Sequence, residues 1–551
     1  MYQIAVYPMS EVIARALGFL SLTIFLLLFG PLPSAYAENP TRPQLHALEP
    51  VGVGSPAPVS LLSGPGTTVS TSFGTSYQVN VNAIGQNMVG DAANEPSICI
   101  DPINPNRMAI GWRQFNSTNS DFRQAGWGFS SNGGVNWTYG GVLETNVFRS
   151  DPVLASDADG RFYYLSLKPD IAFENDLWRS TNGGMTWQRI GSALGGDKAW
   201  FTIDATASTG RGNIYQAWST AGNTWSNRTF SFSRDGGLNW ANPLELPEIP
   251  VWGVLDVGSN GELYQFGWGG GQFWLNRSTN ATNQAGAISF GLTSTVNLAG
   301  SLLFGEGPNP GGLLGQAYVA VDRSTNATRG NVYVLCSTGG FTNNCDVMFA
   351  RSTNGGTTWS GPRRINTDVG ASAWHWFGTM SVAPNGRIDV CWYDTRSNPN
   401  NNFSELYHCY SLDGGLSWAT NRAVSPPFNH SLGYPMQQKI GDYIGMISFD
   451  DSACIAYSAT FNGEEDIYFL RLDLDVPIAL SISRTGAAAL GLSWNSVLGR
   501  TYCVQHKDSL SAPWPIGTNQ VCVVATNTVM TLTDPILPGA PQRFYRVQKQ
   551  P

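Results

Sequence analysis

Charged residues are scarce in this chain. Asp, Glu, Lys and Arg make up 13% of the 551 residues, roughly half the ~25% typical of a globular domain. Those present are mostly acidic, giving a formal net charge of -8 at pH 7. A protein that binds nucleic acid normally carries a basic stripe, so this charge balance argues against that class of partner.

Long apolar runs are confined to the N-terminus. The run ALGFLSLTIFLLLFG at 16–30 follows Arg15 and precedes Ala35-Tyr36-Ala37. A short apolar run followed by a small-residue cleavage site predicts a signal peptide over residues 1–37, with a membrane anchor as the alternative. We therefore expect an exported protein (secreted, periplasmic or at the cell surface) with no membrane span after cleavage.

The cysteines lack the spacings of metal sites. The sequence has eight cysteines but no CxxC motif and no Cys/His cluster with zinc spacing. Three pairs lie close enough in the predicted strands to form local disulfides, with buried free thiols as the alternative. The pairs are Cys336 with Cys345, Cys391 with Cys409, and Cys503 with Cys522.

Glycine and aromatic residues are abundant. The chain has 62 Gly and 19 Trp, and aromatics reach 12%. Turn-forming and sheet-packing residues in this proportion predict an all-β protein.

One eight-residue pattern, ending in Gly-Gly-x-x-Trp, occurs five times. The copies are SSNGGVNW at 130–137, STNGGMTW at 180–187, SRDGGLNW at 233–240, STNGGTTW at 352–359 and SLDGGLSW at 411–418. They recur about every 50 to 60 residues, with one interval of twice that length, and such a period of short strands predicts a β-propeller. Counting the apolar inner strands gives seven blades, with six as the alternative. We expect residues 76–82 to supply the outer strand of the last blade.

The third position of each copy is Asn or Asp. Its side chain can accept hydrogen bonds from amides of a hairpin turn, while Gly supplies positive φ and Trp anchors the turn between sheets. We therefore assign these residues a structural role: Asn132, Asn182, Asp235, Asn354 and Asp413.

Composition divides the rest of the chain. Residues 38–74 are rich in Pro, Ser, Gly and Thr and predict a flexible lead-in. The propeller is expected over residues 75–473. Short strand-like runs over 474–551 predict a small β-sandwich of fibronectin-III or immunoglobulin type, with an irregular β extension as the alternative.

The five turns resemble the bacterial neuraminidase repeat, or Asp box. The wider sequence resembles secreted bacterial sialidase-like (BNR-repeat) proteins from about Glu95 to Leu472. The segments that carry this resemblance are EPSICIDP, SDPVL, GDKAWFTID, VAPNGRIDVCWYDTR, QQKIGDYIGM and TFNGEEDIYFLRL. It implies a propeller that hydrolyses glycans through three Arg, a Tyr nucleophile activated by Glu, and an Asp acid/base. The first inner strand begins Asn94-Glu95-Pro96, where sialidases carry an aromatic-Arg-Ile-Pro motif, so that Arg has no counterpart.

Propeller topology gathers the loops that enter the inner strands at one end of the central channel. Carboxylates and Trp residues concentrated there suit carbohydrate chemistry, since Trp stacks on sugars and two carboxylates divide acid and nucleophile roles. The predicted catalytic residues are Tyr443, Asp442, Asp394 and Asp197. The predicted substrate-binding residues are Arg113, Arg396, Lys198, Lys439, Glu95, Trp200, Trp376 and His375.

Several of these residues have structural alternatives. Asp394 and Arg396 can simply pair, Trp376 can pack between blades, and a lone His375 is more often structural than catalytic. We predict no metal site and no cofactor. A structural calcium ion among the loops stays open, although no DxDxDG loop supports one.

The predicted function is a secreted sialidase-like glycoside hydrolase that acts on a glycan. A non-catalytic glycan- or protein-binding propeller at the cell surface is the first alternative. The second is a lyase acting on acidic polysaccharide, with Lys, His or Tyr as the base.

Overall fold

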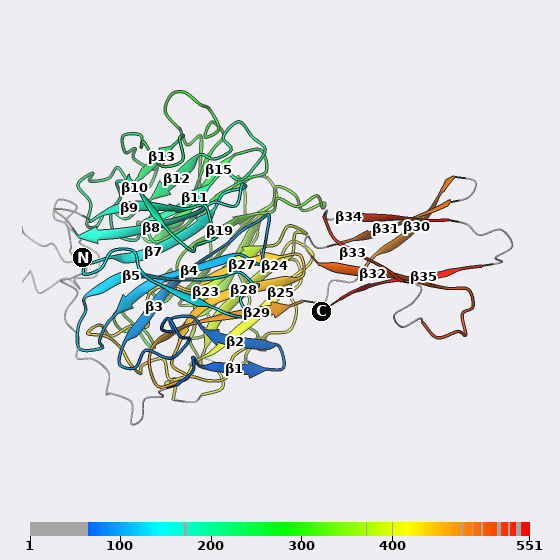
Figure 1. Cartoon of the computed structure of the whole chain (residues 1–551). Coiled ribbons are helices and arrows are strands. Elements are labelled where there is room, and N and C mark those ends of the chain that lie inside the picture. Colours follow the sequence, from blue (N-terminus) through cyan, green and yellow to red (C-terminus); the bar gives the residue numbers. More distant parts are fainter. Residues whose placement is uncertain are drawn as a thin grey trace, which may run out of the picture.

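The computed structural model describes residues 64–169, 173–370, 372–398, 400–474, 478–486, 489–496, 500–514, 520–526, 529–535 and 542–550. The predicted signal peptide and most of the predicted lead-in lie outside these residues. The described chain is all-β, with seven antiparallel sheets in one body and two smaller sheets beside it (Figure 1). In the described part of the chain, no helix is long and apolar enough to cross a membrane.

The first four blades follow one another along the chain. Blade 1 contains β3 (Ala92–Ile100), β4 (Met108–Phe115), β5 (Arg123–Ser130) and β6 (Thr138–Val142). Blade 2 contains β7 (Ser150–Ser156), β8 (Phe162–Pro169), β9 (Phe173–Ser180) and β10 (Gln188–Ser192). Blade 3 has three strands: β11 (Trp200–Ile203), β12 (Ile214–Ala217) and β13 (Phe230–Ser233). Blade 4 contains β14 (Leu255–Val257), β15 (Leu263–Gly269), β16 (Gln272–Ser278) and β17 (Leu292–Val296).

Three further blades complete the ring and confirm the count of seven. Blade 5 contains β19 (Tyr318–Val321), β20 (Val332–Gly339), β21 (Asp346–Ser352) and β22 (Arg363–Arg364), and β18 (Ser301–Leu302) also pairs with β20. Blade 6 contains β23 (His375–Val382), β24 (Ile388–Asp394), β25 (Glu405–Ser411) and β26 (Arg422–Ala423). Blade 7 contains β27 (Gly445–Phe449), β28 (Ser452–Ala459) and β29 (Asp466–Asp473).

Two N-terminal strands close the ring. β2 (Gly74–Gln78) pairs with β29, Ser76 lying opposite Leu470, and β1 (Thr68–Thr71) pairs with β2. This confirms that the outer strand of blade 7 comes from the start of the chain. It also corrects the prediction of a flexible lead-in up to residue 74, because residues 68–74 belong to the sheet.

The five Gly-Gly turns form the hydrogen bonds predicted for them. In the first, the Ser130 hydroxyl bonds Asn132 Oδ1 at 3.0 Å, and the Asn136 amide donates to the same Oδ1 at 3.0 Å. Blade 4 keeps part of this pattern, since the Ser278 hydroxyl bonds Asn280 Oδ1 at 2.8 Å.

The second glycine of each turn lies against the preceding blade. A Cβ atom at Gly134 would overlap the ring of Phe469, and its φ of 88° is left-handed. The same holds for Gly184 against Ala109, Gly237 against Leu177, Gly356 against Leu275 and Gly415 against Phe349. Each turn is therefore a contact between neighbouring blades, which only Gly allows.

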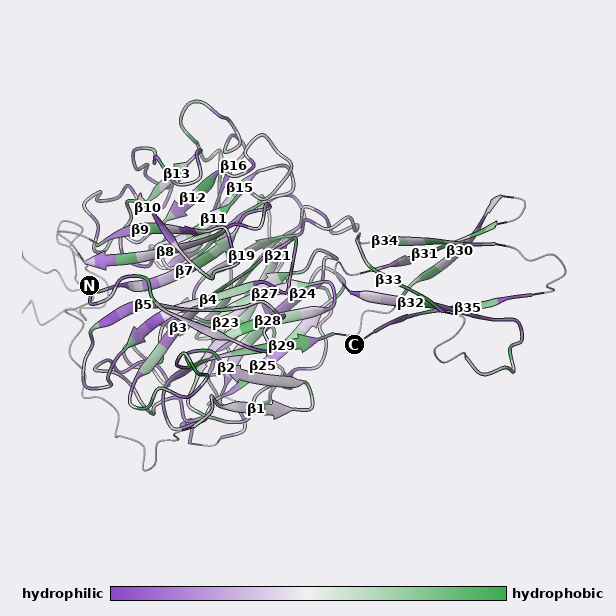
Figure 2. Ribbon diagram, in the orientation of Figure 1, coloured by the Kyte–Doolittle hydropathy of each residue, from purple (hydrophilic) through white to green (hydrophobic). Residues whose placement is uncertain are grey.

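Neighbouring inner strands are also joined by side chains. The Leu154 amide donates to Ser97 Oγ at 2.8 Å between blades 1 and 2, and the Ser448 amide donates to Ser381 Oγ at 3.0 Å between blades 6 and 7. Apolar segments concentrate along the strands of the propeller body, and polar segments in many of its loops (Figure 2). The sheets thus pack through apolar faces, and their ends are free to carry polar groups.

The C-terminal strands form a separate unit that projects from the propeller (Figure 1). One sheet contains β30 (Leu480–Gly486), β31 (Ala489–Asn495) and β34 (Val529–Pro535). The other contains β33 (Gln520–Val524), β32 (Thr501–Lys507) and β35 (Phe544–Lys549). The two sheets enclose a core around Trp494. An ion pair of 2.9 Å joins Arg500 to the buried Asp451 of blade 7.

One of the three predicted disulfides forms. Cys503 and Cys522 are bonded, whereas the cysteines of the other two pairs are free and buried. Cys391 lies opposite His408, while Cys409 lies opposite Val390. Because successive strand residues point to opposite faces, these two thiols lie on different faces of the sheet.

Candidate functional site

A ring of left-handed residues surrounds one end of the central channel. In five blades, a non-glycine residue with positive φ lies near the start of the inner strand or just before it. These residues are Glu95 (54°), Asp151 (48°), Lys198 (52°), Trp252 (55°) and Phe377 (57°). Strain of this kind in non-glycine residues clusters at functional sites. We call this end the mouth of the channel, and the opposite end, where the Gly-Gly turns lie, the turn end.

The local sequence explains two of these positions. Proline follows both Glu95 and Asp151, and it has no N–H to give to the neighbouring strand. The register of β3 shifts between Asn94 and Ser97. The register of β7 shifts in the same way around Asp151. A bulge re-aims the side chain at its centre, so both carboxylates turn out of the regular pleat.

Six charged residues from four blades meet at the mouth. Glu95, Asp151, Lys198 and Asp442 are joined there by Arg113 and Lys439, and we call these six residues the ionic cluster. Lys198 Nζ is at its centre. It contacts Asp442 Oδ2 directly and lies 3.7 Å from Glu95 Oε1 and 3.8 Å from Asp151 Oδ1.

Further contacts complete the ionic cluster. Lys439 Nζ donates to Asp442 Oδ2 at 3.0 Å, and Arg113 Nη2 lies 3.2 Å from Glu95 Oε1. All six residues are buried. Burying this many charges is tolerable only because each faces a partner of opposite sign.

The two central carboxyls have opposite proton affinities. Burial raises the pKa of Glu95 to about 7, despite the opposing charges of Arg113 and Lys198. Burial acts in the same direction on Asp442, but Lys198 and Lys439 outweigh it and hold its pKa well below the usual value. Near neutral pH the cluster therefore contains one carboxyl able to hold a proton and one that stays ionised.

Tyr443 and Trp200 lie beside the ionic cluster. The Tyr443 hydroxyl donates to the carbonyl of Pro152 at 2.9 Å, and burial raises its pKa well above the usual value. Trp200 meets Tyr443 edge-on, with ring centroids 5.2 Å apart. It lines the channel on the turn-end side. Trp200 therefore faces the channel beside Tyr443, and its role in binding substrate stays a prediction.

Asp197, the fourth predicted catalytic residue, is half-buried on the loop before Lys198. Its charge adds to those that raise the pKa of Lys198 against the effect of burial. It therefore belongs to the surroundings of the ionic cluster.

The remaining predicted residues form a separate group on blade 6. His375 Nε2 lies 3.1 Å from Asp368 Oδ1 and 3.5 Å from Asp394 Oδ2. Arg396 Nη2 pairs with Asp394 Oδ2 at 2.7 Å. A cavity of about 290 Å³ lies beside this group, lined by Asp394, Ser397, Asn398, Phe403, Glu405 and Pro427.

Two predicted residues of this group are held in structural contacts. Trp376 is fully buried, donates its Nε1–H to Ser404 Oγ at 3.1 Å and packs on Tyr393, so it cannot stack on a sugar. His375 is also fully buried: its Nδ1–H donates to the Cys345 carbonyl oxygen at 2.7 Å, and its Nε2 faces Asp368 and Asp394, so it positions these two carboxylates. Both side chains turn inward at the start of β23.

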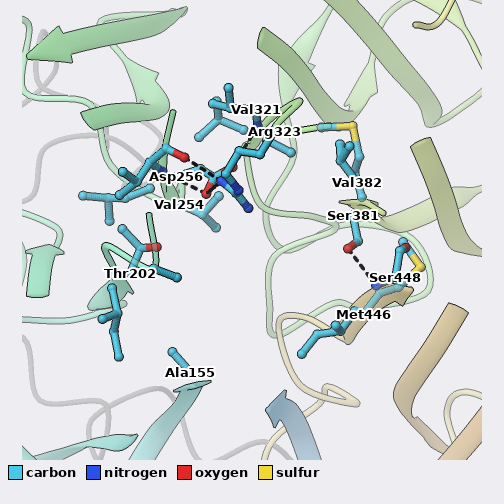
Figure 3. Close-up of a pocket in the computed structure, with 18 of the residues that line it drawn as sticks. Ala155, Thr202, Val254, Asp256, Val321, Arg323, Ser381, Val382, Met446 and Ser448 are labelled. Atoms are coloured by element: carbon cyan, nitrogen blue, oxygen red, sulfur yellow. Dashed lines mark hydrogen bonds and ion pairs between the residues drawn. The ribbon is translucent and has the colours of Figure 1, made fainter. Parts of the chain in front are cut away.

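The channel itself is open on the turn-end side of the ionic cluster. A cavity of about 710 Å³ is lined by the inner strands, with Asp256 and Arg323 paired at 2.7 Å along its wall (Figure 3). Trp200, Tyr318 and Ile444 are part of its lining, but none of the six residues of the ionic cluster is. Figure 3 also shows the hydrogen bond from the Ser448 amide to Ser381 Oγ, which joins blades 6 and 7 at this wall.

Within the described residues, no group of three or more His, Cys, Asp or Glu side chains is arranged to hold a metal ion. The charged side chains that meet at the mouth are three carboxyls, two lysines and one guanidinium.

Sequence reasoning missed the hairpin that lies over the ionic cluster. Residues 303–314 form it, with Phe304 bridged to Leu313. The Leu313 amide donates to Asp442 Oδ1 at 2.8 Å. The available signal was the run Gly-Glu-Gly-Pro-Asn-Pro-Gly-Gly at 305–312, which is dense in turn residues.

Comparisons with known proteins give distant likenesses. No family model matches the chain. A xyloglucanase of Acetivibrio thermocellus is 25% identical over 64% of this chain, which spans about half (46%) of that protein's length. A fungal alcohol oxidase solved with copper has a TM-score of 0.46 at 11% identity, covering 88% of this chain and 92% of that one. The Trypanosoma rangeli sialidase has a TM-score of 0.34 at 12% identity, covering 89% and 88%. TM-scores and identities this low do not transfer an activity.

Proposed function

We propose that this protein is an exported, glycan-active propeller, a glycoside hydrolase whose chemistry is carried by Glu95 and Asp442 at the mouth. One observation carries the proposal: Lys198 bridges two buried carboxyls that have opposite proton affinities. Glycoside hydrolysis needs such a pair, with one carboxyl as acid and the other ionised. The distant xyloglucanase supports a glycan as the substrate class.

The roles follow from the pKa values. With a pKa near 7, Glu95 holds a proton that it can give to the leaving oxygen of a glycosidic bond. Asp442 stays ionised beside its two lysines, as a nucleophile, a base or a stabiliser of positive charge on the sugar ring must be. Lys198 and Arg113 would then orient the sugar hydroxyls.

A sialoside is a poorer fit than a neutral glycan. Arg113 is the only Arg of the ionic cluster, whereas a sialidase-like site uses three to hold the carboxylate. The hydroxyl of Tyr443 is engaged with a backbone carbonyl, and its raised pKa disfavours the nucleophilic phenolate. Sialidase activity through Tyr443 is therefore the weaker version of this proposal.

The experiment compares two substrates on the protein lacking residues 1–37. We expect xyloglucan oligosaccharides to be cleaved and a fluorogenic sialoside to be left intact. Glu95→Gln and Asp442→Asn should each abolish cleavage, while Tyr443→Phe should retain it. Turnover of the sialoside that is lost in Tyr443→Phe would replace this proposal with a sialidase mechanism. No turnover of either substrate, with wild-type folding, would count against hydrolysis of both.

A second candidate function is glycan binding without turnover. The observation favouring it is that Glu95 is 0% and Asp442 1% exposed, so neither carboxyl reaches solvent in this conformation. A glycan array separates the two functions, because a binding protein would retain its ligand unchanged.

A further inference from the structure

The hairpin at 303–314 lies directly on the ionic cluster. Besides the Leu313 amide on Asp442, the Gly311 amide donates to the Gln438 carbonyl at 2.8 Å. Asn309 accepts from the Ile440 amide at 3.1 Å and donates to the Gly441 carbonyl at 2.9 Å. These bonds hold the hairpin against the segment that supplies Lys439 and Asp442.

The fit at Gly312 is especially close. A Cβ atom there would lie 2.6 Å from Asn309 Nδ2 and 2.9 Å from Lys439 Cδ, and closer still to Asp442 Oδ1. The backbone of the hairpin thus rests on Asp442, which pairs with Lys198, and on Lys439. With it in place, Lys198 and Lys439 have only 5% and 1% of their side chains exposed.

The hairpin is anchored at its base by apolar side chains and at its tip by hydrogen bonds, since Asn309 is fully buried and the Tyr434 hydroxyl donates to the Pro308 carbonyl at 3.2 Å. Leu313 and Leu314 are buried in the propeller cores. Residues 304–312, in contrast, contain four Gly and two Pro, and Phe304, 47% exposed, is their one large apolar side chain. Segments held by hydrogen bonds with little buried apolar area open at low free-energy cost.

We propose that residues 304–312 are a removable cover over the ionic cluster, and that a ligand reaches Lys198 and Asp442 only when this cover has moved. The anchored Leu313 and Leu314 are the fixed end about which it moves. The proposal concerns access to the cluster, and it rests on the proposed function only for the identity of the ligand.

The lysines provide a direct test. The chain has five, Lys168, Lys198, Lys439, Lys507 and Lys549, and two of them lie under the cover. The folded full chain is treated with an acylating N-hydroxysuccinimide ester, and labelling at each lysine is followed by mass spectrometry. In the wild type we expect Lys198 and Lys439 to label far more slowly than the other three.

Gly312→Ala should open the cover, because the added methyl group has no room against Asp442 and Asn309. We expect labelling of Lys198 and Lys439 to rise at least tenfold, with the other three lysines unchanged. Gly361→Ala is the matched control, since no atom lies within 4 Å of its added Cβ. Asn309→Ala, which removes the bonds to Ile440 and Gly441, should open the cover independently.

Continued protection of Lys198 and Lys439 in both Gly312→Ala and Asn309→Ala would overturn the proposal. So would equal acceleration at all five lysines, because that pattern means global loosening. Labelling requires no saccharide, so a chain that shows the expected pattern but cleaves no glycan keeps the cover and loses the proposed hydrolase activity.

Discussion

The two ends of the propeller differ in how far their residues follow the sequence repeat. At the turn end, one sequence pattern repeats, positive φ falls on glycines, and each turn makes the same hydrogen bonds. At the mouth, positive φ falls on five residues of five different types, Glu, Asp, Lys, Trp and Phe. The repeat thus builds the scaffold, while departures from it build the candidate site.

The largest effect should come from removing the central cation of the mouth. Lys198→Met would leave three buried carboxyls with one fewer partner, which we expect to destabilise the fold by about 3–5 kcal/mol. The free energy of unfolding in urea measures this. Lys168→Met, on a partly exposed side chain, should change it by less than about 0.5 kcal/mol. Equal effects of the two substitutions would mean that the ionic cluster is not structurally coupled.

A methyl group at the turn end should have the next largest effect. Gly134→Ala combines a left-handed backbone with overlap of Phe469, so we expect a loss of roughly 3 kcal/mol. Gly85→Ala shares the left-handed backbone, but its Cβ would have no neighbour within 4 Å, and about 1 kcal/mol is expected. The difference between the two stability losses measures the contact between blades, and thermal unfolding of both variants tests it. Equal losses in the two variants would mean that the turns are independent of neighbouring blades.

The stability that Glu95 contributes at the mouth should also depend on pH. The pKa of Glu95 is raised in the folded state to about 7, from an ordinary value of 4.5. The folded protein therefore binds a proton that the unfolded chain releases. The resulting stability is complete below pH 4.5 and is lost as the pH rises through 7. Between pH 5 and 7 the wild type should lose about 2 kcal/mol more than Glu95→Gln does, by urea unfolding. Parallel pH profiles for the two proteins would show that Glu95 titrates normally.

The smallest effect should be a charge change at the turn end. Asp413→Asn keeps the acceptor that bonds the Ser417 amide at 2.8 Å, and three other turns already carry Asn. At pH 7 we expect a change below about 0.5 kcal/mol, because the side chain is partly exposed to solvent. Burial acts to raise its pKa, but hydrogen bonds from Ser417 and its neighbours together outweigh burial and lower the pKa to about 2. The contribution of the charge is therefore present above pH 3.8 and lost as the pH falls through 2. The free energy of unfolding of the wild type and of Asp413→Asn, measured in urea at pH 7 and at pH 2, checks this. A difference well above about 0.5 kcal/mol at pH 7 would show that the charge of Asp413 has a larger role.

Sequence patterns predicted the scaffold well because its signals are local. The turn residues, the seven inner strands and the closing strand were all readable from spacing, and β2 closes the ring as expected. The sequence also pointed to Glu95, Arg113, Lys198, Lys439 and Asp442, which the structure brings together.

The rest depended on three-dimensional features that spacing does not encode. Trp376 stands at a strand entrance like the others, yet the bulge after it turns its ring into the core. The left-handed φ of Lys198 could not be predicted, because the residue at that position is not a glycine. The hairpin over Asp442 belongs to the segment that leads into blade 5. Its residue Leu313 lies 129 residues before Asp442 in the sequence, and only the folded chain brings the two together.

The strand that closes the ring affects the order in which this protein folds. Asn80 bonds Asp466 across 386 residues of sequence, so the strand made first pairs with the blade made last. A contact this remote must wait for synthesis of the whole propeller, and until then blade 7 has no partner to complete it. We therefore expect folding to end with a single docking step of the N-terminal strands, during which two unpaired sheet edges are exposed to other chains.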